Sequence, residues 1–354
     1  MTIQGWDLIV GRDKLNKTHV VEAPAVAPAD GEVRLRIESF ALTANNVTYA
    51  MAGDQLGYWQ FFPAPEGWGR IPVWGYGVVE VSRHPDFQPG ERFYGYWPMS
   101  SHLVAQPRRT PAGFIDDAPH RAPLPPTYNL YQSAPAGGDF EAERSVILFT
   151  TSFLLEDFLE ESDFHGARSV ILTSASSRTA IGLAHRLKAA GKVKVVGLTS
   201  PRNQAFVEAL GYYDQVVLYD DFEAAPVATP AVLVDFAGDA GLIRRIHERF
   251  GDELKYSCLV GLTHWQDFTG GQSEPMPGPA PIFFFAPDRI TKRRQDWGPE
   301  GFHQRHDAAW RTFAADTGRW LKIQTCQGAE AAKTAYLAVL AGEARPDQGI
   351  IVKP

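Results

Sequence analysis

The chain of 354 residues has little cysteine and no long apolar segment. Its two cysteines, Cys258 and Cys326, lack the spacing of a metal site, and zinc needs more ligands than they supply. They could form one disulfide, although so few cysteines fit a reducing compartment better. No segment approaches the roughly 18 apolar residues of a membrane-spanning helix, and residues 1–10 lack the pattern of a signal peptide. We therefore expect a cytoplasmic protein without a membrane partner.

Basic residues are also in deficit, because 34 lysines and arginines stand against 41 aspartates and glutamates, a formal net charge of −7. A nucleic-acid partner requires a positive surface, so none is expected. His303 and His306 are three positions apart and could share one helical face. No third metal ligand stands near them in the sequence, so the simpler interpretation is a solvated surface pair.

The first third of the chain has the pattern of β structure. Residues 31–38 alternate apolar and polar side chains, as a half-buried strand does. Residues 73–81 are another strand candidate, and a Pro-Gly turn signal at 89–90 precedes the aromatic segment 93–97. Residues 107–135 are rich in proline and polar residues, which predicts a loop or a connection between domains.

From about residue 144 the pattern changes to strands that alternate with helices, which indicates βαβ units and a doubly wound parallel sheet. The expected strands are 170–173, 193–198, 216–218, 231–235 and 258–261, and the expected helices are 180–190, 203–210 and 241–250. Beyond Gly270 the pattern predicts helices at 307–320 and 329–340 and a last strand at 349–352.

The turn after the first of these strands lacks the glycines that a nucleotide-binding turn usually carries. In their place stand Ser174, Ala175, Ser176, Ser177, Arg178 and Thr179, and only Gly182 is kept. A helix N-terminus attracts phosphate, and hydroxyl groups can donate hydrogen bonds to it. Gly182 is expected to allow close packing of helix and strand. By itself the turn fits an ordinary helix cap as well as it fits a phosphate site.

The next strand ends without the acidic residue that an NAD site uses to hold the ribose hydroxyls. The sequence there is Thr199, Ser200, Pro201 and Arg202. Ser200 and Arg202 suit a 2′-phosphate, because arginine pairs with phosphate through charge-assisted hydrogen bonds. The alternative is a polar turn that begins the following helix. Taken together, the two turns favour NADP(H).

Six stretches carry a resemblance to a known family, and they occur in the family's order: 31–37, 49–53, 77–81, 89–93, 210–217 and 234–238. The chain resembles the medium-chain dehydrogenase/reductase superfamily, in its zinc-free, quinone-oxidoreductase-like branch, which includes groups described only as domains of unknown function. The resemblance implies an α/β protein and a homodimer. It implies a GroES-like β-barrel catalytic domain at 1–135 and a doubly wound, Rossmann-type NADP(H)-binding domain at 136–285. The C-terminal segment 286–354 would return to the catalytic domain.

The zinc ligands of the superfamily are missing from the matching positions. The resemblance places the first zinc cysteine at Ala44 and the His-Glu pair at Val73 and Trp74. The asparagine and the lysine of the quinone reductases are also replaced, at Ala44 and Ile350. Without a Lewis-acid metal, hydrogen-bond donors must polarise the substrate.

Candidate catalytic residues come from both domains. The resemblance implies that Tyr49 lines the nicotinamide pocket, and Asn45 and Asn46 stand just before it. Tyr58 opens an aromatic segment, 58–62, which is expected to wall the cleft. A tyrosine could donate a proton to a developing enolate, although aromatic residues of a β domain more often serve in packing.

The last Rossmann strand contributes a second group of candidates. Its end, with Gly261 and Thr263, would face the nicotinamide, and His264 would act as a general acid unless it is an ordinary surface histidine. The basic run 292–294 is either a solvated face or a holder of an acidic substrate.

These features predict a zinc-independent, NADP(H)-dependent oxidoreductase. Its small-molecule substrate would be an activated C=C compound, a quinone or a carbonyl compound, and the aromatic segments suggest an aromatic one. Two alternatives remain open: a lyase or isomerase-like enzyme on the same fold, and a non-catalytic protein that senses NADP(H) or binds a partner.

Overall fold

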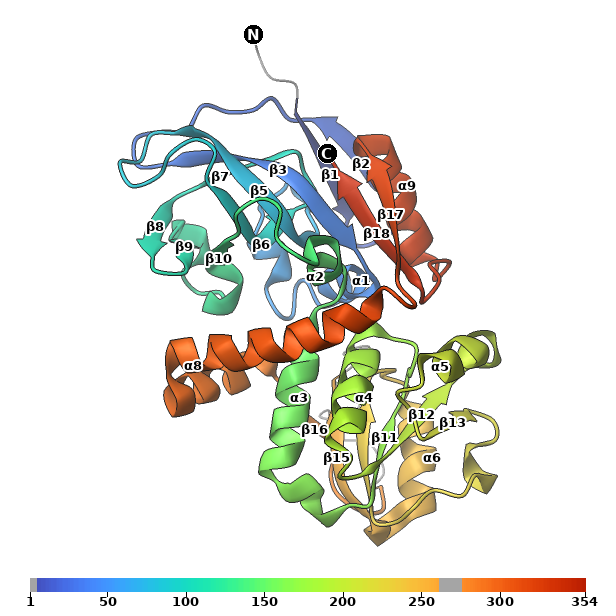
Figure 1. Cartoon of the computed structure of the whole chain (residues 1–354). Helices are drawn as coiled ribbons and strands as arrows, with labels where there is room; N and C mark the ends of the chain where they lie inside the picture. Colours follow the sequence, from blue (N-terminus) through green and yellow to red (C-terminus); the bar gives the residue numbers. More distant parts are fainter. Residues whose placement is uncertain (1–4, 261–275) are drawn as a thin grey trace. The chain divides into compact units, whose positions relative to one another are not determined.

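The computed structural model of this chain describes residues 5–260 and 276–354 (Figure 1). The chain forms two compact units, unit 1 from Met1–Val146 and Leu321–Pro354, and unit 2 from Ile147–Trp320. The expected boundaries therefore shift. Unit 1 extends to Val146 because α2 (Glu141–Val146) packs against β3 (Val33–Leu42) and β18 (Gln348–Lys353). The chain returns to unit 1 only at Leu321, because α8 (Ala286–Thr317) packs on α3 (Phe149–Glu161) of unit 2.

Unit 1 consists of two sheets. The nine-stranded sheet has the order β17-β18-β3-β5-β6-β10-β9-β8, with β7 paired to β3, and the three-stranded sheet has the order β2-β1-β4. The remaining strands are β1 (Trp6–Gly11), β2 (Thr18–Glu22), β4 (Trp68–Gly69), β5 (Pro72–Ser82), β6 (Arg92–Pro98), β7 (His102–Ala105), β8 (Pro107–Thr110), β9 (Gly113–Asp116), β10 (Leu130–Ser133) and β17 (Lys322–Gln327). The helices are α1 (Ala44–Met51), α9 (Ala329–Leu340), η1 (Tyr58–Gln60), η2 (Pro119–Arg121) and η3 (Pro126–Asn129).

The prediction of a loop at residues 107–135 is wrong, because this segment contains β8, β9 and β10. Its prolines are compatible with a sheet by position. Pro107 opens β8, an edge strand, where a missing N–H removes no ladder bond from the interior. Pro119 and Pro126 begin the short helices η2 and η3 instead of interrupting a strand.

The core of unit 1 encloses Trp59, which is 2% exposed. Two glycines make room for its indole. A Cβ at Gly53 would lie 2.2 Å from Trp59 Nε1, and a Cβ at Gly69 would lie 2.3 Å from Trp59 Cε3. Gly53, which belongs to one of the stretches behind the family resemblance, is thus required for packing. Trp59 is a core residue of unit 1 and not part of a cleft wall.

Unit 2 has a six-stranded parallel sheet with the order β13-β12-β11-β14-β15-β16, which corresponds to 3-2-1-4-5-6 in chain order. Its strands are β11 (Ser169–Leu172), β12 (Lys194–Thr199), β13 (Gln215–Leu218), β14 (Ala231–Asp235), β15 (Leu254–Leu259) and β16 (Ile282–Phe283). Its other helices are α4 (Arg178–Ala190), α5 (Gln204–Leu210), α6 (Ala240–Phe250), η4 (Asp163–Gly166), η5 (Pro201–Asn203), η6 (Phe222–Ala224) and η7 (Gly251–Glu253). The doubly wound prediction is confirmed.

Helix α8 is much longer than the predicted helix at 307–320, and it is kinked. Gly298 has φ 72° and ψ 160°, and Pro299 follows it, so the helical path breaks between an N-terminal and a C-terminal half. The C-terminal half packs aromatic side chains on α3, where the Phe149 and Phe313 rings stack with centroids 5.2 Å apart. The sequence pattern predicted only this apolar half.

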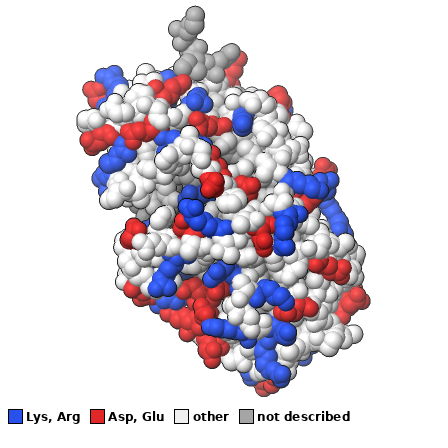
Figure 2. All heavy atoms as spheres, in the orientation of Figure 1, with Lys and Arg blue, Asp and Glu red and all other residues white. Residues whose placement is uncertain are grey.

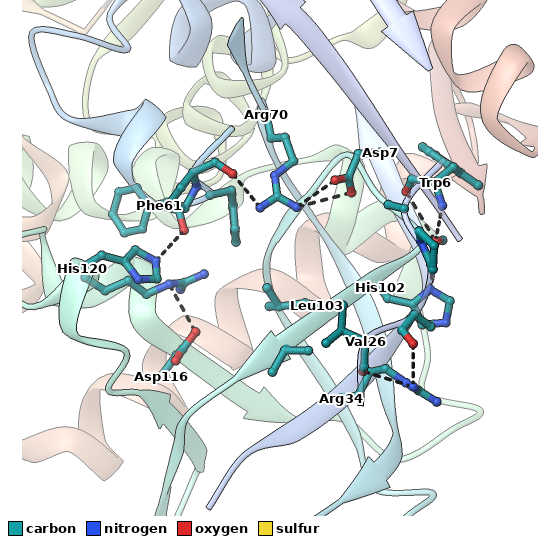
Figure 3. Close-up of a pocket in the computed structure, with 18 residues that line it drawn as sticks. Trp6, Asp7, Val26, Arg34, Phe61, Arg70, His102, Leu103, Asp116 and His120 are labelled. Atoms are coloured by element: carbon teal, nitrogen blue, oxygen red, sulfur yellow. Dashed lines mark hydrogen bonds and ion pairs between the residues drawn. The ribbon is translucent and has the colours of Figure 1, made fainter. Parts of the chain in front are cut away.

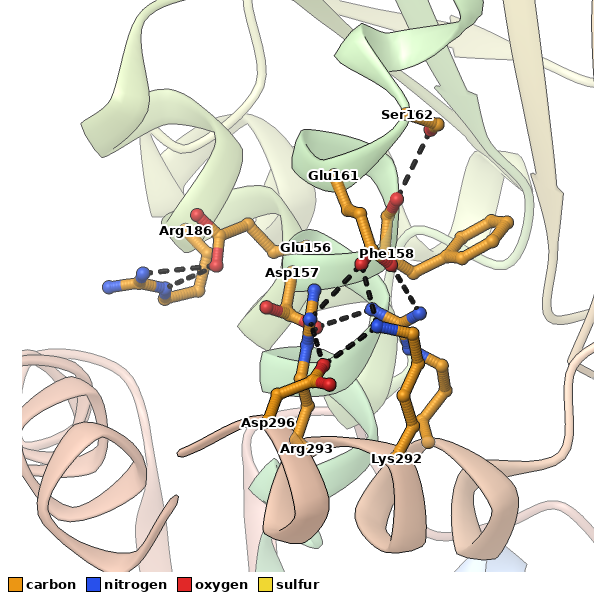
Figure 4. Close-up of polar contacts among 10 residues, drawn as sticks. Glu156, Asp157, Phe158, Glu161, Ser162, Arg186, Lys292, Arg293 and Asp296 are labelled. Atoms are coloured by element: carbon orange, nitrogen blue, oxygen red, sulfur yellow. Dashed lines mark hydrogen bonds and ion pairs between the residues drawn. The ribbon is translucent and has the colours of Figure 1, made fainter. Parts of the chain in front are cut away.

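The N-terminal half of α8 is held to α3 by ion pairs (Figure 4). Arg293 Nε lies 2.6 Å from Asp157 Oδ2, and Lys292 Nζ lies 2.8 Å from Glu161 Oε1. Hydrogen bonds from Lys292 and Arg289 lower the pKa of Glu161 to about 2. Lys292 and Arg293 of the basic run 292–294 therefore serve a helix–helix contact, and neither sequence interpretation of the run, solvated face or substrate holder, describes this role.

A left-handed turn connects α3 to β11. Asp163, Phe164 and His165 have φ values of 48°, 51° and 52°, and Gly166 completes the turn at 74°. For residues with a Cβ, this conformation costs about 1–2 kcal/mol each. Phe164 is buried, and the His165 ring stacks on Tyr256 at 4.3 Å, so tertiary packing holds the turn in place.

Asp163 is exposed, so Asp163→Gly tests this strain without loss of packing. Glycine adopts positive φ freely but loses more entropy on folding, so we expect a net gain of about 0.5–1 kcal/mol in the free energy of unfolding. The matched control is Ala308→Gly at an exposed position inside α8, which should lose about 0.5–1 kcal/mol. Urea unfolding followed by tryptophan fluorescence measures both. A destabilised Asp163→Gly protein would show that the turn is not strained.

Candidate functional site

The carboxyl ends of β11 and β12 meet the N-terminus of α4 in unit 2, where doubly wound folds bind ligands. Ser174 has φ 48°, so a serine takes the left-handed conformation that glycine supplies in most such turns. The Ser174 N–H donates to the Tyr219 hydroxyl at 3.0 Å, and the Ala175 N–H donates to the Leu198 carbonyl at 3.0 Å. Side chains and β12 therefore fix the turn without a glycine fingerprint.

The predicted serines Ser176 and Ser177 are held in place by hydrogen bonds that their hydroxyl oxygens accept. Ser177 caps α4 by accepting from the Ala180 N–H, and Ser176 Oγ accepts from Asn203 Nδ2 at 3.0 Å. Both hydroxyls act as acceptors there, so their protons can still be donated. Within the described residues, the N–H groups of Ser176 and Thr179 donate no hydrogen bond. The turn thus presents amide and hydroxyl donors at the positive end of a helix.

Two residues that shape this turn were missed by the sequence analysis. Tyr213 donates from its hydroxyl to the Ala175 carbonyl at 2.7 Å and lies against β12 at Gly197. A Cβ at Gly197 would lie 2.6 Å from the Tyr213 ring and 3.0 Å from the Ala175 side chain. A glycine inside an apolar strand is a signal of close approach, and it could have been used here.

A buried hydrogen-bond cluster ties β11 to β14. Thr173 Oγ1 donates to Asp235 Oδ1 at 2.6 Å and accepts from the Phe236 N–H at 2.8 Å. Asp235 Oδ2 accepts from the Gly238 N–H at 2.8 Å. Burial raises the pKa of Asp235, and these donors only partly offset the rise. The sequence signal for this cluster is an aspartate at the end of the apolar strand 231–235.

Gly182 does not pack helix against strand as predicted. A Cβ at this position would lie 2.6 Å from Ser152 Oγ and 3.4 Å from the Phe149 ring, and both residues belong to α3. Ser152 Oγ also donates to the Thr179 carbonyl at 2.8 Å. The glycine is therefore needed where two helices, α3 and α4, come into close contact.

The remaining predicted cofactor residues lie at the same edge of the sheet. Burial lowers the pKa of Arg178 to about 10. Thr199 is 1% exposed, and its hydroxyl has no hydrogen-bond partner among the described residues. Ser200 is half-buried, and Arg202 is exposed in η5, directly after β12. This end of β12 carries hydroxyl groups and a guanidinium but no carboxylate.

In unit 1, Tyr49 lies in a cluster of aromatic side chains on α1, η1, η3 and β6. Its hydroxyl accepts a hydrogen bond from Trp74 Nε1 at 3.0 Å. The sequence resemblance places the zinc-site glutamate of the zinc-dependent members at Trp74. Burial raises the pKa of Tyr49, and hydrogen bonds from Trp74 and Asn45 lower it only in part. The phenol therefore keeps its proton well beyond pH 10.

The predicted pair Tyr49 and Tyr58 is brought together, with ring centroids 4.7 Å apart. The Tyr58 and Tyr128 hydroxyls are 3.3 Å apart. Tyr96 is fully buried beside them, and its hydroxyl has no hydrogen-bond partner among the described residues. Phe61 completes the cluster at 0% exposure, so the aromatic side chains of the segment 58–62 are buried inside unit 1 instead of forming an open wall.

Hydrogen bonds to the backbone hold the Asn46 side chain in place. Its Oδ1 accepts from the Thr43 N–H at 2.7 Å, and its Nδ2 donates to the Pro72 carbonyl at 2.9 Å. These bonds anchor the start of α1 to the start of β5. The catalytic role predicted for Asn46 stays a prediction, and these contacts do not favour it.

Three predicted residues, Gly261, Thr263 and His264, lie outside the described residues. Within residues 5–260 and 276–354, no group of three or more His, Cys, Asp or Glu side chains could hold a metal ion. His306 Nε2 lies 3.1 Å from Thr150 Oγ1 and does not act as a surface partner of His303. Cys258 and Cys326 are both free.

The surface and the helices add two general observations. On the face shown in Figure 2, acidic and basic side chains are intermixed. In the part of the chain that the structure describes, no helix has both the length and the apolar character needed to cross a membrane.

The fold is shared with solved structures of proteins described as reductases and of a protein in complex with NADPH. A Mesorhizobium loti protein assigned as an NADPH:quinone reductase has a TM-score of 0.65 and 13% identity, and both chains are covered completely, at 100%. CurA from Vibrio vulnificus, in complex with NADPH, has a TM-score of 0.60 and 14% identity, with 98% of each chain covered. The CurK enoyl reductase has a TM-score of 0.61 and 12% identity, with 99% of each chain covered.

The fold expected from the sequence resemblance is thus confirmed: a GroES-like unit and a Rossmann-type unit. At the level of sequence, a family model described as a protein of unknown function (DUF2855) matches residues 40–345, and the chain belongs to this family. No sequence among the curated proteins matches the chain.

The contact at Gly182 gives a test of how α4 is positioned. Gly182→Ala should lower the free energy of unfolding by about 1–3 kcal/mol, because the new methyl group would overlap Ser152 Oγ. Adding Ser152→Gly should recover part of that loss, since it removes the overlapping atoms. Urea unfolding of both single variants and the double variant measures the coupling. Additive losses in the double variant would mean that this contact does not require the glycine.

Proposed function

We propose that this protein is a zinc-independent, NADP(H)-dependent oxidoreductase whose unit 2 binds the dinucleotide at the ends of β11 and β12. The observation that carries the proposal is the end of β12. Thr199, Ser200 and Arg202 stand there without a carboxylate, beside a helix N-terminus that presents free donors. A carboxylate at this position would repel a 2′-phosphate, whereas an arginine pairs with it.

The residues present fit the phosphates of such a dinucleotide. The N–H groups of Ser176 and Thr179, together with the hydroxyls of Ser176 and Ser177, would bind the pyrophosphate. Ser200 and Arg202 would bind the 2′-phosphate. The buried hydroxyl of Thr199 lies beside them, has no hydrogen-bond partner in the described part of the chain and offers one further donor. The NADPH complex of CurA, which shares this fold, supports the assignment.

Bound NADPH supplies the hydride, and the chain contributes positioning and the proton. Tyr49 is suited to the second role. Its oxygen already accepts a hydrogen bond from Trp74, so its own proton is free to be donated elsewhere. Because burial raises its pKa, Tyr49 stays protonated at neutral pH and acts as an acid, not as a base.

The substrate class follows from the same groups. Val73 and Trp74 occupy the family's zinc-ligand positions, and neither can ligate zinc. Hydrogen bonding from a phenol must therefore stabilise the oxygen that gains charge. An activated C=C compound, a quinone or a carbonyl compound has such an oxygen. The reductase descriptions of the CurK and Mesorhizobium loti proteins agree with this class.

The cofactor assignment is tested by titrating the protein with NADPH and NADH while following tryptophan fluorescence. NADPH should bind more tightly than NADH. Arg202→Ala should weaken NADPH binding by at least tenfold and leave NADH binding nearly unchanged, because only NADPH carries the 2′-phosphate. The matched control is Arg168→Ala, an exposed arginine at the opposite end of β11, with no expected effect. Tighter binding of NADH, or binding of neither nucleotide, would refute the assignment.

The role of Tyr49 is tested by Tyr49→Phe in NADPH oxidation assays with quinones, enones and aldehydes. We expect kcat to fall by about 10²–10⁴-fold, the usual contribution of a general acid, with unchanged NADPH affinity. The control is Tyr336→Phe, which removes another buried hydroxyl of unit 1, bonded to the Leu15 carbonyl at 2.9 Å.

The pH dependence gives a second readout for the same residue. The raised pKa of Tyr49 means that its acidic form persists as the pH rises through 10, so the wild-type rate should show no loss from phenol ionisation between pH 7 and about 10. Full activity of Tyr49→Phe with every reducible substrate would eliminate this residue as the proton donor.

A further inference from the structure

A cavity of about 260 Å³ lies within unit 1 (Figure 3). The basic side chains that line it include Arg70, His102, His120 and Arg121. Apolar side chains that line it include Phe61, Leu103 and Val104. Arg70 follows β4, and His120 and Arg121 belong to η2, so separate segments bring these groups to one space. This lining does not include Tyr49 or any of the predicted cofactor residues.

The two guanidinium groups of the cavity are held in place by carboxylates. Arg121 is 1% exposed, and its Nε lies 3.2 Å from Asp116 Oδ2. Arg70 Nη1 lies 3.3 Å from both carboxylate oxygens of Asp7, and its Nη2 donates to the Pro63 carbonyl at 2.9 Å. These contacts fix the direction of both groups before any ligand arrives, which lowers the entropic cost of binding.

Three buried nitrogens of lining residues make no hydrogen bond among the described residues: Arg70 Nε, Arg121 Nε and His102 Nε2. Two of them still face a carboxylate, because Arg121 Nε lies 3.2 Å from Asp116 Oδ2 and His102 Nε2 lies 3.5 Å from Glu80 Oε2. Buried polar groups in folded proteins are nearly always hydrogen-bonded, so three such atoms at one space need an explanation. A guanidinium carries only donors, five in all. The lining carboxylates, Asp7 and Asp116, therefore leave Arg70 Nε and Arg121 Nε without an aligned acceptor.

The charges of the lining must also be counted. Arg34, Arg70 and Arg121 line the cavity together with Asp7 and Asp116. Arg34 pairs with a carboxylate that is not part of the lining, because its Nε donates to Glu80 Oε2 at 2.9 Å. A further acceptor in the cavity would therefore bind Arg70 and Arg121. Planar guanidinium groups bind carboxylates through paired N–H bonds.

We propose that this cavity binds the carboxylate of a small organic acid, with its apolar body against Leu103 and Val104, which line the cavity and are only half-buried. The volume suits this class of ligand. A cavity of about 150 Å³ holds benzene, so about 260 Å³ admits one ring with a carboxylate.

Isothermal titration calorimetry of the whole protein with benzoate and hexanoate tests the proposal, with benzamide as the uncharged analogue. At least one of the two acids should bind at a single site. For benzoate, benzamide should bind at least tenfold more weakly, because it lacks the second acceptor oxygen and the charge. Arg70→Gln should weaken carboxylate binding at least tenfold. The control Arg108→Gln, on the exposed side of β8 where it pairs with Asp117, should leave it unchanged.

A second variant covers the case in which Arg70→Gln does not fold. Leu103→Trp places an indole in the cavity from β7 and should abolish carboxylate binding. Titration of the same samples with NADPH reports on unit 2 separately, so failure of this proposal and failure of the proposed function can be told apart.

Three results would overturn the proposal. Neither acid binds the wild-type protein, which would leave water as the occupant. Benzamide binds as well as benzoate. A folded Arg70→Gln or Leu103→Trp variant binds the acids as the wild-type protein does. A crystal structure provides a further test. After crystals are soaked with 4-bromobenzoate, the ligand density should lie between Arg70 and Arg121, and density only elsewhere would contradict the assignment.

Discussion

The hydrogen bond between Thr173 and Asp235 is the constraint on which the proposed nucleotide site depends. It joins the carboxyl ends of β11 and β14, the two strands at which the order of the sheet reverses. A carboxyl buried this deeply is costly unless its oxygens are satisfied, and here Thr173 and the Gly238 N–H satisfy them. The two strand ends, and the turns that leave them, are thereby held in fixed relative positions.

The serine-rich turn is rigid for a related reason. Its first amide and the Ala175 carbonyl are occupied by two tyrosine hydroxyls, from Tyr219 and Tyr213, while Gly182 admits α3 against α4. The protein replaces a flexible glycine loop with a turn fixed by side chains. The N–H groups that remain unpaired, those of Ser176 and Thr179, then point from a preorganised frame, which is what an anion site requires.

In unit 1, contacts between distant segments likewise decide the role of each aromatic residue. Trp59 fills the core, Trp74 donates to Tyr49, and Phe61 lies between the tyrosine cluster and the arginine-lined cavity. Composition alone cannot assign these roles, because all three are large apolar residues from neighbouring stretches. Each role depends on which strand or helix comes to lie opposite the ring, and hence on pairing between distant segments.

The sequence by itself determined the alternation of strands and helices in unit 2, the missing zinc ligands and the acid-free end of β12, since these depend on local pattern and residue type. Only the tertiary structure decided that residues 107–135 contain strands, that Lys292 and Arg293 pair with α3, and that Gly182 meets Ser152. It also gathered Arg70 and Arg121 around one cavity. The reason is physical: a strand, an ion pair or a cavity wall is completed by partners far away in the chain, and local preference carries no information about them.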